Sequence, residues 1–171
     1  MTSKPRVTNT GAASGNMVRD SALGLVPETL NPYLRLNTQI WEMGPLSAAY
    51  LEVARLRNAN KVNCVFCKNA RYDVAKAAGL TEDKVQMIDD DYPESMLGDR
   101  EKLILAYTDQ YLNDPASLSE ELKTKLVATF TAQELVQLSI GIVQFNCFSR
   151  FAVALGGMPD ELPRMEISLP E

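Results

Sequence analysis

Apolar residues recur at helical spacing through most of the chain. In residues 46–58 the apolar side chains fall at positions 46, 49, 50, 53 and 56, which is the spacing of one helix face. Similar signals predict helices over residues 32–43, 46–58, 64–78, 81–88, 100–112 and 132–155, with one more beginning after Ser117. No segment shows strand alternation bounded by hairpin turns. The pattern therefore predicts an all-α domain, a compact array of about seven helices.

Residues that start or stop helices set these boundaries. The expected N-caps are Asn31 before Pro32, Asn63, Thr81 and Asp99, and capping boxes join Ser117 to Glu120 and Thr131 to Glu134. The expected ends are Gly44, the polar stretch 58–61, Gly79 and Gly156–Gly157. These signals make residues 64–78 one continuous helix with Cys64 in its first turn.

The two ends of the chain lack this periodicity. Residues 1–20 are polar and predict a flexible N-terminal arm, which leaves residues 21–171 as a single domain. The segment after Gly157 has three prolines and is expected to be extended. The last helix, residues 132–155, is largely apolar and is expected to lie in the core or in a subunit contact.

Composition narrows the function classes. The chain has 171 residues, 46% of them hydrophobic, and a net charge of -5, which argues against a protein that binds nucleic acid through its phosphates. We expect that no apolar run approaches the ~20 residues that span a bilayer. The first twenty residues lack the apolar region of a signal peptide. We therefore expect a cytoplasmic protein without a membrane segment.

Two residue counts limit the chemistry further. The chain has no histidine, which excludes histidine-based triads and histidine-rich metal sites. It has three cysteines, an odd and small number that does not suit a secreted disulfide framework.

Cys64 and Cys67 carry the most informative pattern. Two thiols one helical turn apart can approach closely enough to form a disulfide, and free N–H groups at a helix start favour a thiolate. Lys68 and Arg71 follow as nearby cations, with Arg71 expected on the same helix face as Cys67. The position in the helix alone would make Cys64 the more reactive thiol. We interpret the pair as a redox dithiol.

Two other interpretations of these cysteines stay open. A zinc site would have to add Cys147 and a carboxylate to the pair. Alternatively, both residues are buried core cysteines at helical spacing. Cys147 itself lies in the apolar last helix and is expected to be a packed core residue.

Glu52 is the second candidate for chemistry. It lies in an apolar run twelve residues before Cys64, and the polar stretch between them is long enough to fold the cysteine helix back beside it. A carboxylate in an apolar setting can accept or return a proton near neutral pH, which suits a base for a thiol. The alternative is an exposed ion pair between Glu52 and Arg55 at i,i+3.

These residues together resemble a known family. Glu52, a gap of eleven residues and Cys64-x-x-Cys67 at the start of a segment ending in AAGLTEDKV resemble the AhpD-like branch of the carboxymuconolactone decarboxylase superfamily. The stretch from Asp99 to Gly156 also fits the second half of that family. The resemblance covers about residues 30 to 157.

The resemblance implies an all-helical homo-oligomer, a trimer or a hexamer, that reduces peroxides or disulfides. By position, Cys67 would be the attacking thiol and pass through a sulfenic acid, and Cys64 would resolve it to a disulfide. Glu52 would accept the proton. A lipoyl-like or thioredoxin-like dithiol would reduce the pair again, so that no metal or organic cofactor is needed.

One position departs from the family pattern. Where that pattern has a histidine four residues after the second cysteine, this chain has Arg71. An arginine can pair with a thiolate or with Glu52, but it cannot shuttle protons; water or Tyr72 would have to replace the relay. In the last helix, Arg150 at i,i+4 from Asn146 is expected either to hold an interior ion pair or to orient Glu52.

Two further functions remain as alternatives. The superfamily includes lactone decarboxylases, which do not rely on a CxxC pair, and the fold could also serve as a non-catalytic oligomeric interaction protein. A decarboxylase should survive replacement of both cysteines by serine, whereas in a non-catalytic protein the dithiol should have an ordinary thiol pKa and react slowly with peroxides.

Overall fold

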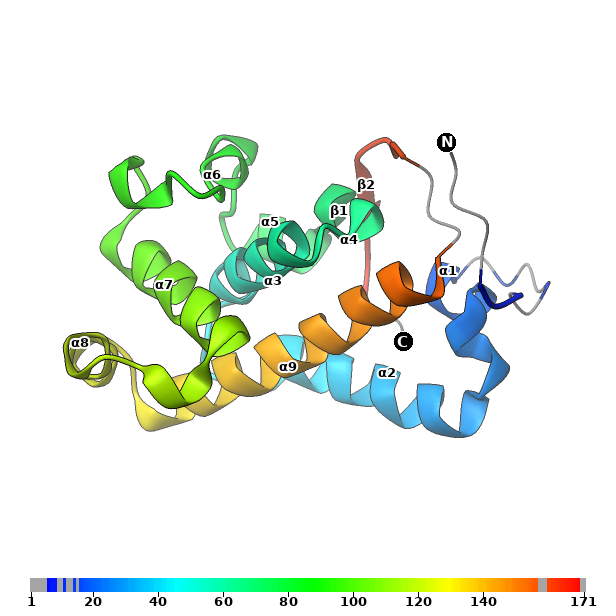
Figure 1. Ribbon diagram of the computed structural model, residues 1–171, viewed down its shortest axis with the longest axis horizontal. Helices are drawn as coiled ribbons and strands as arrows, with labels where there is room; N and C mark the ends of the chain where they lie inside the picture. Colours follow the sequence, from blue (N-terminus) through cyan, green and yellow to red (C-terminus); the bar gives the residue numbers. More distant parts are fainter. Residues whose placement is uncertain (1–5, 9–10, 12–13, 15, 157–159, 170–171) are drawn as a thin grey trace.

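The computed structural model describes residues 6–8, 11, 14, 16–156 and 160–169 (Figure 1). Its α-helices are α1 (Met17–Asp20), α2 (Pro27–Glu42), α3 (Ala48–Val62), α4 (Val65–Asn69), α5 (Asp73–Ala77), α6 (Glu82–Gln86), α7 (Asp99–Asn113), α8 (Glu120–Thr129) and α9 (Ala132–Leu155). Three 3-10 turns, η1 (Ala22–Leu25), η2 (Tyr92–Glu94) and η3 (Pro115–Ser117), and two strands, β1 (Ala70–Tyr72) and β2 (Met165–Ile167), complete the described part. The helical prediction is confirmed, but the expectation of no strands is wrong.

Helix α3 forms the centre of the fold. It packs most extensively against α9 and α7, which lie on either side of it, and α2 packs along α9 (Figure 1). The core that these helices share is aliphatic and fully buried at Leu51, Val53, Leu105, Leu138 and Ile142. Removing such surfaces from water is the main source of stability.

Helix α9 is central, as expected, and is started by the predicted capping box of Thr131 and Glu134. By length and composition alone it could cross a bilayer, so the expectation that no apolar run approaches that length was wrong. About a third of that stretch is buried in this fold, and the core helix of a globular domain passes the same test. Its outer face exposes Val136 and Ile140, which border an apolar groove shared with α2.

Several helix boundaries differ from the prediction. Helix α2 begins at Pro27 and contains Pro32, so Asn31 is not its cap. Helix α3 continues through the polar stretch 58–61 to Val62, because Asn58 is buried with hydrogen-bond partners inside the fold. Helix α8 is capped by Ser119 rather than Ser117.

The segment from Cys64 to Ala78 is not one helix. It forms two short helices, α4 and α5, separated by β1, which pairs in parallel with β2. The carbonyls of Cys67 and Ala70, which a continuous helix would use for its own bonds, instead accept N–H groups from Arg55 of α3 (2.7 and 2.8 Å). A buried guanidinium and a strand from the far end of the sequence therefore divide the helix.

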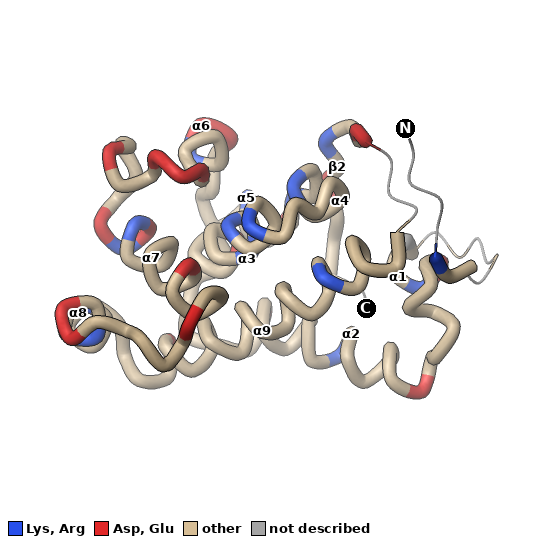
Figure 2. The backbone as a smooth tube through the Cα atoms, in the orientation of Figure 1, with Lys and Arg blue, Asp and Glu red and all other residues tan. Residues whose placement is uncertain are grey.

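Residues near both ends of the sequence, such as Val18 and Ile167, lie beside Cys67 of this segment. Part of the predicted arm, residues 1–20, lies outside the described residues; in the rest, Met17–Asp20 form α1 and the Arg6 N–H donates to the Leu155 carbonyl (2.7 Å). The C-terminal segment, expected to be extended, supplies β2. Acidic residues gather along the loop between α6 and α7 (Figure 2), away from both ends.

Candidate active site

The cysteine pair lies directly after α3. Asn63 ends α3 in the left-handed conformation (φ 56°), and Cys64 is itself the N-cap of α4, so Asn63 is not the expected cap. The Cys67 N–H donates to Cys64 Sγ (3.2 Å). The two residues form a disulfide with their Cα atoms 5.2 Å apart. The predicted pairing of these two thiols is therefore geometrically feasible.

The two cysteines differ in access. Cys64 is completely buried, whereas Cys67 lies at the wall of a cavity of about 320 Å³. Much of that wall is apolar, formed by Val18, Leu34, Phe66, Phe145, Phe148 and Ile167. Polar groups come from Asn37, Arg55, Tyr72, Ser149 and Glu166, among others. Residues of the N-terminal arm and of β2 thus line the cavity together with residues of the core.

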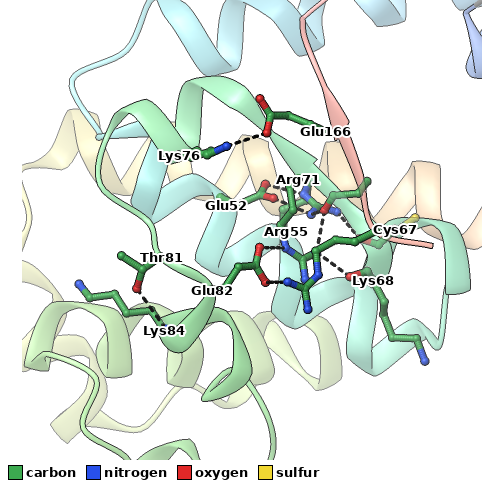
Figure 3. Close-up of polar contacts among 12 residues, drawn as sticks. Glu52, Arg55, Cys67, Lys68, Arg71, Lys76, Thr81, Glu82, Lys84 and Glu166 are labelled. Carbon is green, nitrogen blue, oxygen red and sulfur yellow. Dashed lines mark hydrogen bonds and ion pairs between the residues drawn. The ribbon is translucent and has the colours of Figure 1, made fainter. Parts of the chain in front are cut away.

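Glu52 lies behind Cys67, held by Arg55. Arg55 Nε and Nη2 donate to the two carboxylate oxygens of Glu52 (2.6 and 2.7 Å), and both side chains are almost completely buried. This is the i,i+3 pair that the sequence offered as an alternative, but it is buried rather than exposed. Figure 3 shows Arg55 between Glu52 and the cysteine turn. The structure thus brings Glu52 near Cys67 through a guanidinium.

Arg55 stays charged in this setting. Burial on its own would lower the pKa of Arg55, but the paired Glu52 carboxylate outweighs it and the pKa is raised. The ring of Tyr72 lies 5.6 Å from the guanidinium carbon. Burial also raises the pKa of Tyr72, so this phenol stays protonated at neutral pH. The site therefore holds a buried Arg55–Glu52 ion pair beside a neutral tyrosine ring.

Arg71 does not take the position that helical spacing predicted. It lies in β1, and its Nε forms an ion pair with Glu82 (2.9 Å) while Nη1 donates to the carbonyls of Lys68 and Ala70 (Figure 3). Because α4 ends at Asn69, Arg71 does not share a helix face with Cys67. Lys68 turns to Asn63 (2.7 Å). The cation that contacts the cysteine turn is Arg55 of α3. The sequence pattern indicated Arg55 only as a partner of Glu52 in an exposed ion pair.

A second polar group reaches Cys67 from α9. Ser149 Oγ lies 3.4 Å from Cys67 Sγ and accepts a hydrogen bond from Asn58 Nδ2 (2.9 Å). Asn146 Nδ2 donates to Asn58 Oδ1, and Arg150 Nε donates to Asn146 Oδ1 (both 2.8 Å). Arg150 is exposed, so the expectations of an interior ion pair or of a contact with Glu52 are wrong. Asn58 and Ser149 were not identified as site residues from the sequence. A polar residue on an otherwise apolar helix face is the signal that could have located them.

The third cysteine lies elsewhere on α9. Cys147 is half-buried and free, and it contributes, after burial, to raising the pKa of Tyr33 well above its usual range. Among the residues that the structure describes, no group of three or more His, Cys, Asp or Glu side chains is placed to hold a metal ion.

Comparisons with known proteins give relatives without an established activity. No family model matches the chain. An uncharacterized protein of Mycobacterium tuberculosis (strain H37Rv) is 28% identical over 156 residues, covering 91% of this chain and 52% of that protein. The uncharacterized protein YnjA of Escherichia coli K12 is 30% identical over 112 residues, covering 65% and 61%. The chain spans about half the length of the mycobacterial relative.

Solved structures identify the fold. An Agrobacterium tumefaciens protein of unknown function, named as a candidate antioxidant defence protein AhpD, superposes with a TM-score of 0.66 at 19% identity, over 89% of this chain and 95% of that one. An uncharacterized peroxidase-related protein from Silicibacter gives 0.67 at 17% identity, over 81% and 73%. The chain has an AhpD-like fold, as its sequence resemblance implied.

Proposed function

We propose that this protein is a thiol-dependent redox enzyme that reduces organic hydroperoxides through the Cys64–Cys67 pair. The observation that carries the proposal is the position of Cys67, which lies at the wall of a partly apolar cavity and within disulfide distance of a second, buried cysteine. The AhpD-like fold and the peroxidase-related structural neighbour support it.

The two cysteines differ in access, and this difference supports different roles for them. A peroxide in the cavity can meet Cys67, whereas Cys64 is fully buried at the start of α4. We therefore propose Cys67 as the attacking thiol and Cys64 as the resolving thiol. This agrees with the role that the family resemblance implies and not with the position of Cys64 nearest the helix start.

The proposed reaction consumes two thiols and one peroxide. The Cys67 thiolate attacks the terminal peroxide oxygen, the S–O bond forms and the O–O bond breaks. The alkoxide leaves and takes up a proton to become an alcohol. The Cys64 thiolate then attacks the sulfenic sulfur, the disulfide forms, and hydroxide leaves as water after protonation. The two cysteines lose two electrons and the peroxide gains them.

Arg55 is proposed to stabilise the leaving oxygen. Its Nε and Nη2 hydrogens bind Glu52 and Ala70, and one Nη1 hydrogen binds the Cys67 carbonyl. A guanidinium has five N–H donors, so one Nη1 hydrogen has no acceptor within the described part of the chain. Arg55 also lines the cavity. In this proposal the spare N–H of the guanidinium donates to the developing alkoxide and lowers its energy.

Glu52 then has a different role from the one predicted. Both of its oxygens accept from Arg55, so in this proposal it fixes the guanidinium instead of accepting the thiol proton. Arg71, which is paired with Glu82, takes part in no step.

The proposal includes a substrate class and a reductant. Aromatic walls at Phe66, Phe145 and Phe148 suit a hydroperoxide with an apolar tail better than hydrogen peroxide itself. A lipoyl-like or thioredoxin-like dithiol would return the disulfide to two thiols. We also propose that the protein works as a homo-oligomer, since the groove between α2 and α9 exposes apolar side chains such as Met43 and Val136. A cytoplasmic location remains the expectation from the sequence.

Single-turnover oxidation of the reduced protein tests this function. Cumene hydroperoxide and hydrogen peroxide are mixed with wild type, Cys64→Ser, Cys67→Ser and the matched control Cys147→Ser, and mass spectrometry locates the oxidised sulfur. We expect fast disulfide formation in wild type and in Cys147→Ser, and a sulfenic acid on Cys67 in Cys64→Ser. Cys67→Ser should lose at least about 100-fold in rate, because the nucleophile itself is gone.

The alternatives give other results. Oxidation of wild type no faster than that of a free cysteine would reject the peroxidase and favour a non-catalytic interaction protein. A lactone decarboxylase would keep its activity when both cysteines are replaced by serine.

A further inference from the structure

A chain of four hydrogen bonds joins the protein surface to Cys67 Sγ. It starts at the exposed Arg150, crosses from α9 to α3 and back, and ends 3.4 Å from the sulfur. Its members, in order, are Arg150, Asn146, Asn58, Ser149 and Cys67. Asn58 is fully buried and Ser149 is 2% exposed, so the fold buries uncharged polar side chains beside the Cys67 sulfur.

The direction of every hydrogen bond in the chain follows from its first member. A guanidinium has no acceptor, so Asn146 must turn its Oδ1 towards Arg150 and its Nδ2 towards Asn58. Asn58 then accepts through Oδ1 and donates through Nδ2 to Ser149 Oγ. The hydroxyl oxygen is occupied as an acceptor, and its single hydrogen points to Cys67 Sγ. All four bonds therefore donate towards the sulfur.

A sulfur at the end of such a chain is most stabilised when it is negatively charged. A disulfide sulfur or a thiol is a weak acceptor, whereas a hydrogen bond to an ionised group is roughly twice as strong as a neutral one. Hydrogen bonds in a chain also polarise one another in the same direction. The four aligned donors therefore favour the Cys67 thiolate over both the thiol and the disulfide.

We propose that Ser149 is a catalytic residue that stabilises the Cys67 thiolate, and that Asn58, Asn146 and Arg150 position its hydroxyl. That this thiolate attacks a peroxide rests on the proposed function. That Ser149 stabilises the thiolate does not depend on that function. These hydrogen bonds give the attacking sulfur a polar partner, which the histidine of the family pattern, replaced here by Arg71, would otherwise supply. They do so without moving a proton through a titratable group.

Other charged and titratable groups also face this part of the site. Arg55 of α3 donates to the Cys67 carbonyl with Glu52 behind it, and Tyr72 of β1 and Glu166 of β2 line the cavity. Because these groups border the same cavity as Cys67, the test has to isolate the contribution of Ser149.

The alkylation rate of Cys67 against pH measures the thiolate directly. Reduced protein carrying Cys64→Ser and Cys147→Ser has Cys67 as its single thiol, and iodoacetamide is the probe. In this background, Ser149→Ala should raise the pKa of Cys67 and slow alkylation at pH 7 by about tenfold, since one hydrogen bond to a charged group is lost. Ser149→Thr, which keeps the hydroxyl, should restore most of the rate.

Two further variants bracket the effect. Ser139→Ala is the matched control, because Ser139 is a half-buried hydroxyl on the same helix that bonds to Tyr107 (2.7 Å) and not to a cysteine; its pH profile should equal that of the background. Arg150→Leu changes only the exposed start of the chain and should shift the profile in the same direction as Ser149→Ala, by about twofold to threefold in rate.

Each outcome decides between the two proposals. An unchanged pH profile in folded Ser149→Ala overturns the thiolate proposal, and so does an unchanged profile in Arg150→Leu if Ser149→Ala does not fold. A shifted profile together with no peroxide reactivity in the protein with all three native cysteines upholds the stabilised thiolate and rejects the peroxidase. Fast peroxide reduction with an unshifted profile does the reverse.

Discussion

Helix α3 buries two arginines two residues apart, and they serve different parts of the molecule. Arg55 is 6% exposed and binds Glu52 and the carbonyls of Cys67 and Ala70. Arg57 is 2% exposed and binds both oxygens of Asp109, as well as Asp90. A separation of two residues turns the side chains about 200° apart around a helix. One arginine therefore faces the cysteine turn and the other faces α7 and the acidic loop.

Arg55 with Glu52 forms the Arg55 cluster, and Arg57 with Asp109 and Asp90 forms the Arg57 cluster. The two clusters differ in how exposed their carboxylates are. The Glu52 side chain is 1% exposed, whereas those of Asp109 and Asp90 are 27% and 80% exposed. The Arg57 cluster therefore keeps much of its carboxylate hydration and holds a surface loop to α7. The Arg55 cluster has both charges out of water, which is costly unless geometry and extra hydrogen bonds compensate. Such a buried pair beside a cavity and a sulfur suggests a functional site, while the other suggests a structural tie.

Removing one partner of the buried pair should have the largest effect. Arg55→Met leaves the Glu52 carboxylate buried without its guanidinium and should cost about 3–5 kcal/mol of unfolding free energy. The double variant Glu52→Leu with Arg55→Met should regain a large part of that loss, because no charge remains buried. Urea unfolding followed by circular dichroism measures both. If the double variant lost as much unfolding free energy as Arg55→Met or more, the unpaired Glu52 carboxylate would not be the cause of the loss.

Arg57 should give a smaller and purely structural effect. In Arg57→Met the two aspartates can return to water, so we expect a loss of about 1–2 kcal/mol, with contributions from the lost charged hydrogen bonds. Unfolding by urea is again the measurement, with the alkylation rate of Cys67 recorded beside it. That rate should stay within about twofold of the parent protein. A tenfold change would mean that the two clusters are coupled through α3.

The sequence predicted what depends on local signals. Helical periodicity located most helices, and Thr81 and the Thr131–Glu134 box cap theirs as expected. The CxxC spacing and the position of Glu52 also pointed to the region where the structure places the site. These features are encoded within a few residues, or in the length of one short connection, and so can be read without the fold.

What could not be predicted depends on partners distant in sequence. The expected helix over residues 64–78 is divided because Arg55 takes the carbonyls of Cys67 and Ala70 and because β2 pairs with β1. For the same reason Arg71 leaves the face of Cys67. Asn58 looked like the end of a helix, and only the packing of α9 on α3 shows that it bonds to Ser149. Long-range contacts of this kind have no periodicity to reveal them.

The smallest predicted effect concerns the exposed side of the Arg57 cluster. Hydrogen bonds from Lys61 and then from Arg57 lower the pKa of Asp90 below its ordinary value of 3.8. A lowered pKa in the folded state stabilises the protein above pH 3.8, and this contribution is lost as the pH falls through the folded value. Lys61→Met should therefore raise the pKa of Asp90 towards 3.8, as followed by NMR titration of its carboxyl carbon.

Salt provides the sharper comparison between the two clusters. Because the Asp90 side chain is 80% exposed, 1 M NaCl should also move its pKa upwards, since the screening length falls to about 3 Å. The buried Arg55–Glu52 pair is screened much less, so the same salt should leave the alkylation profile of Cys67 nearly unchanged. If Asp90 proved insensitive to salt, or if Cys67 responded as strongly as Asp90, the distinction between a hydrated tie and a desolvated site would fail. The two titrations, made on one protein under one change of conditions, compare the arginines without altering either.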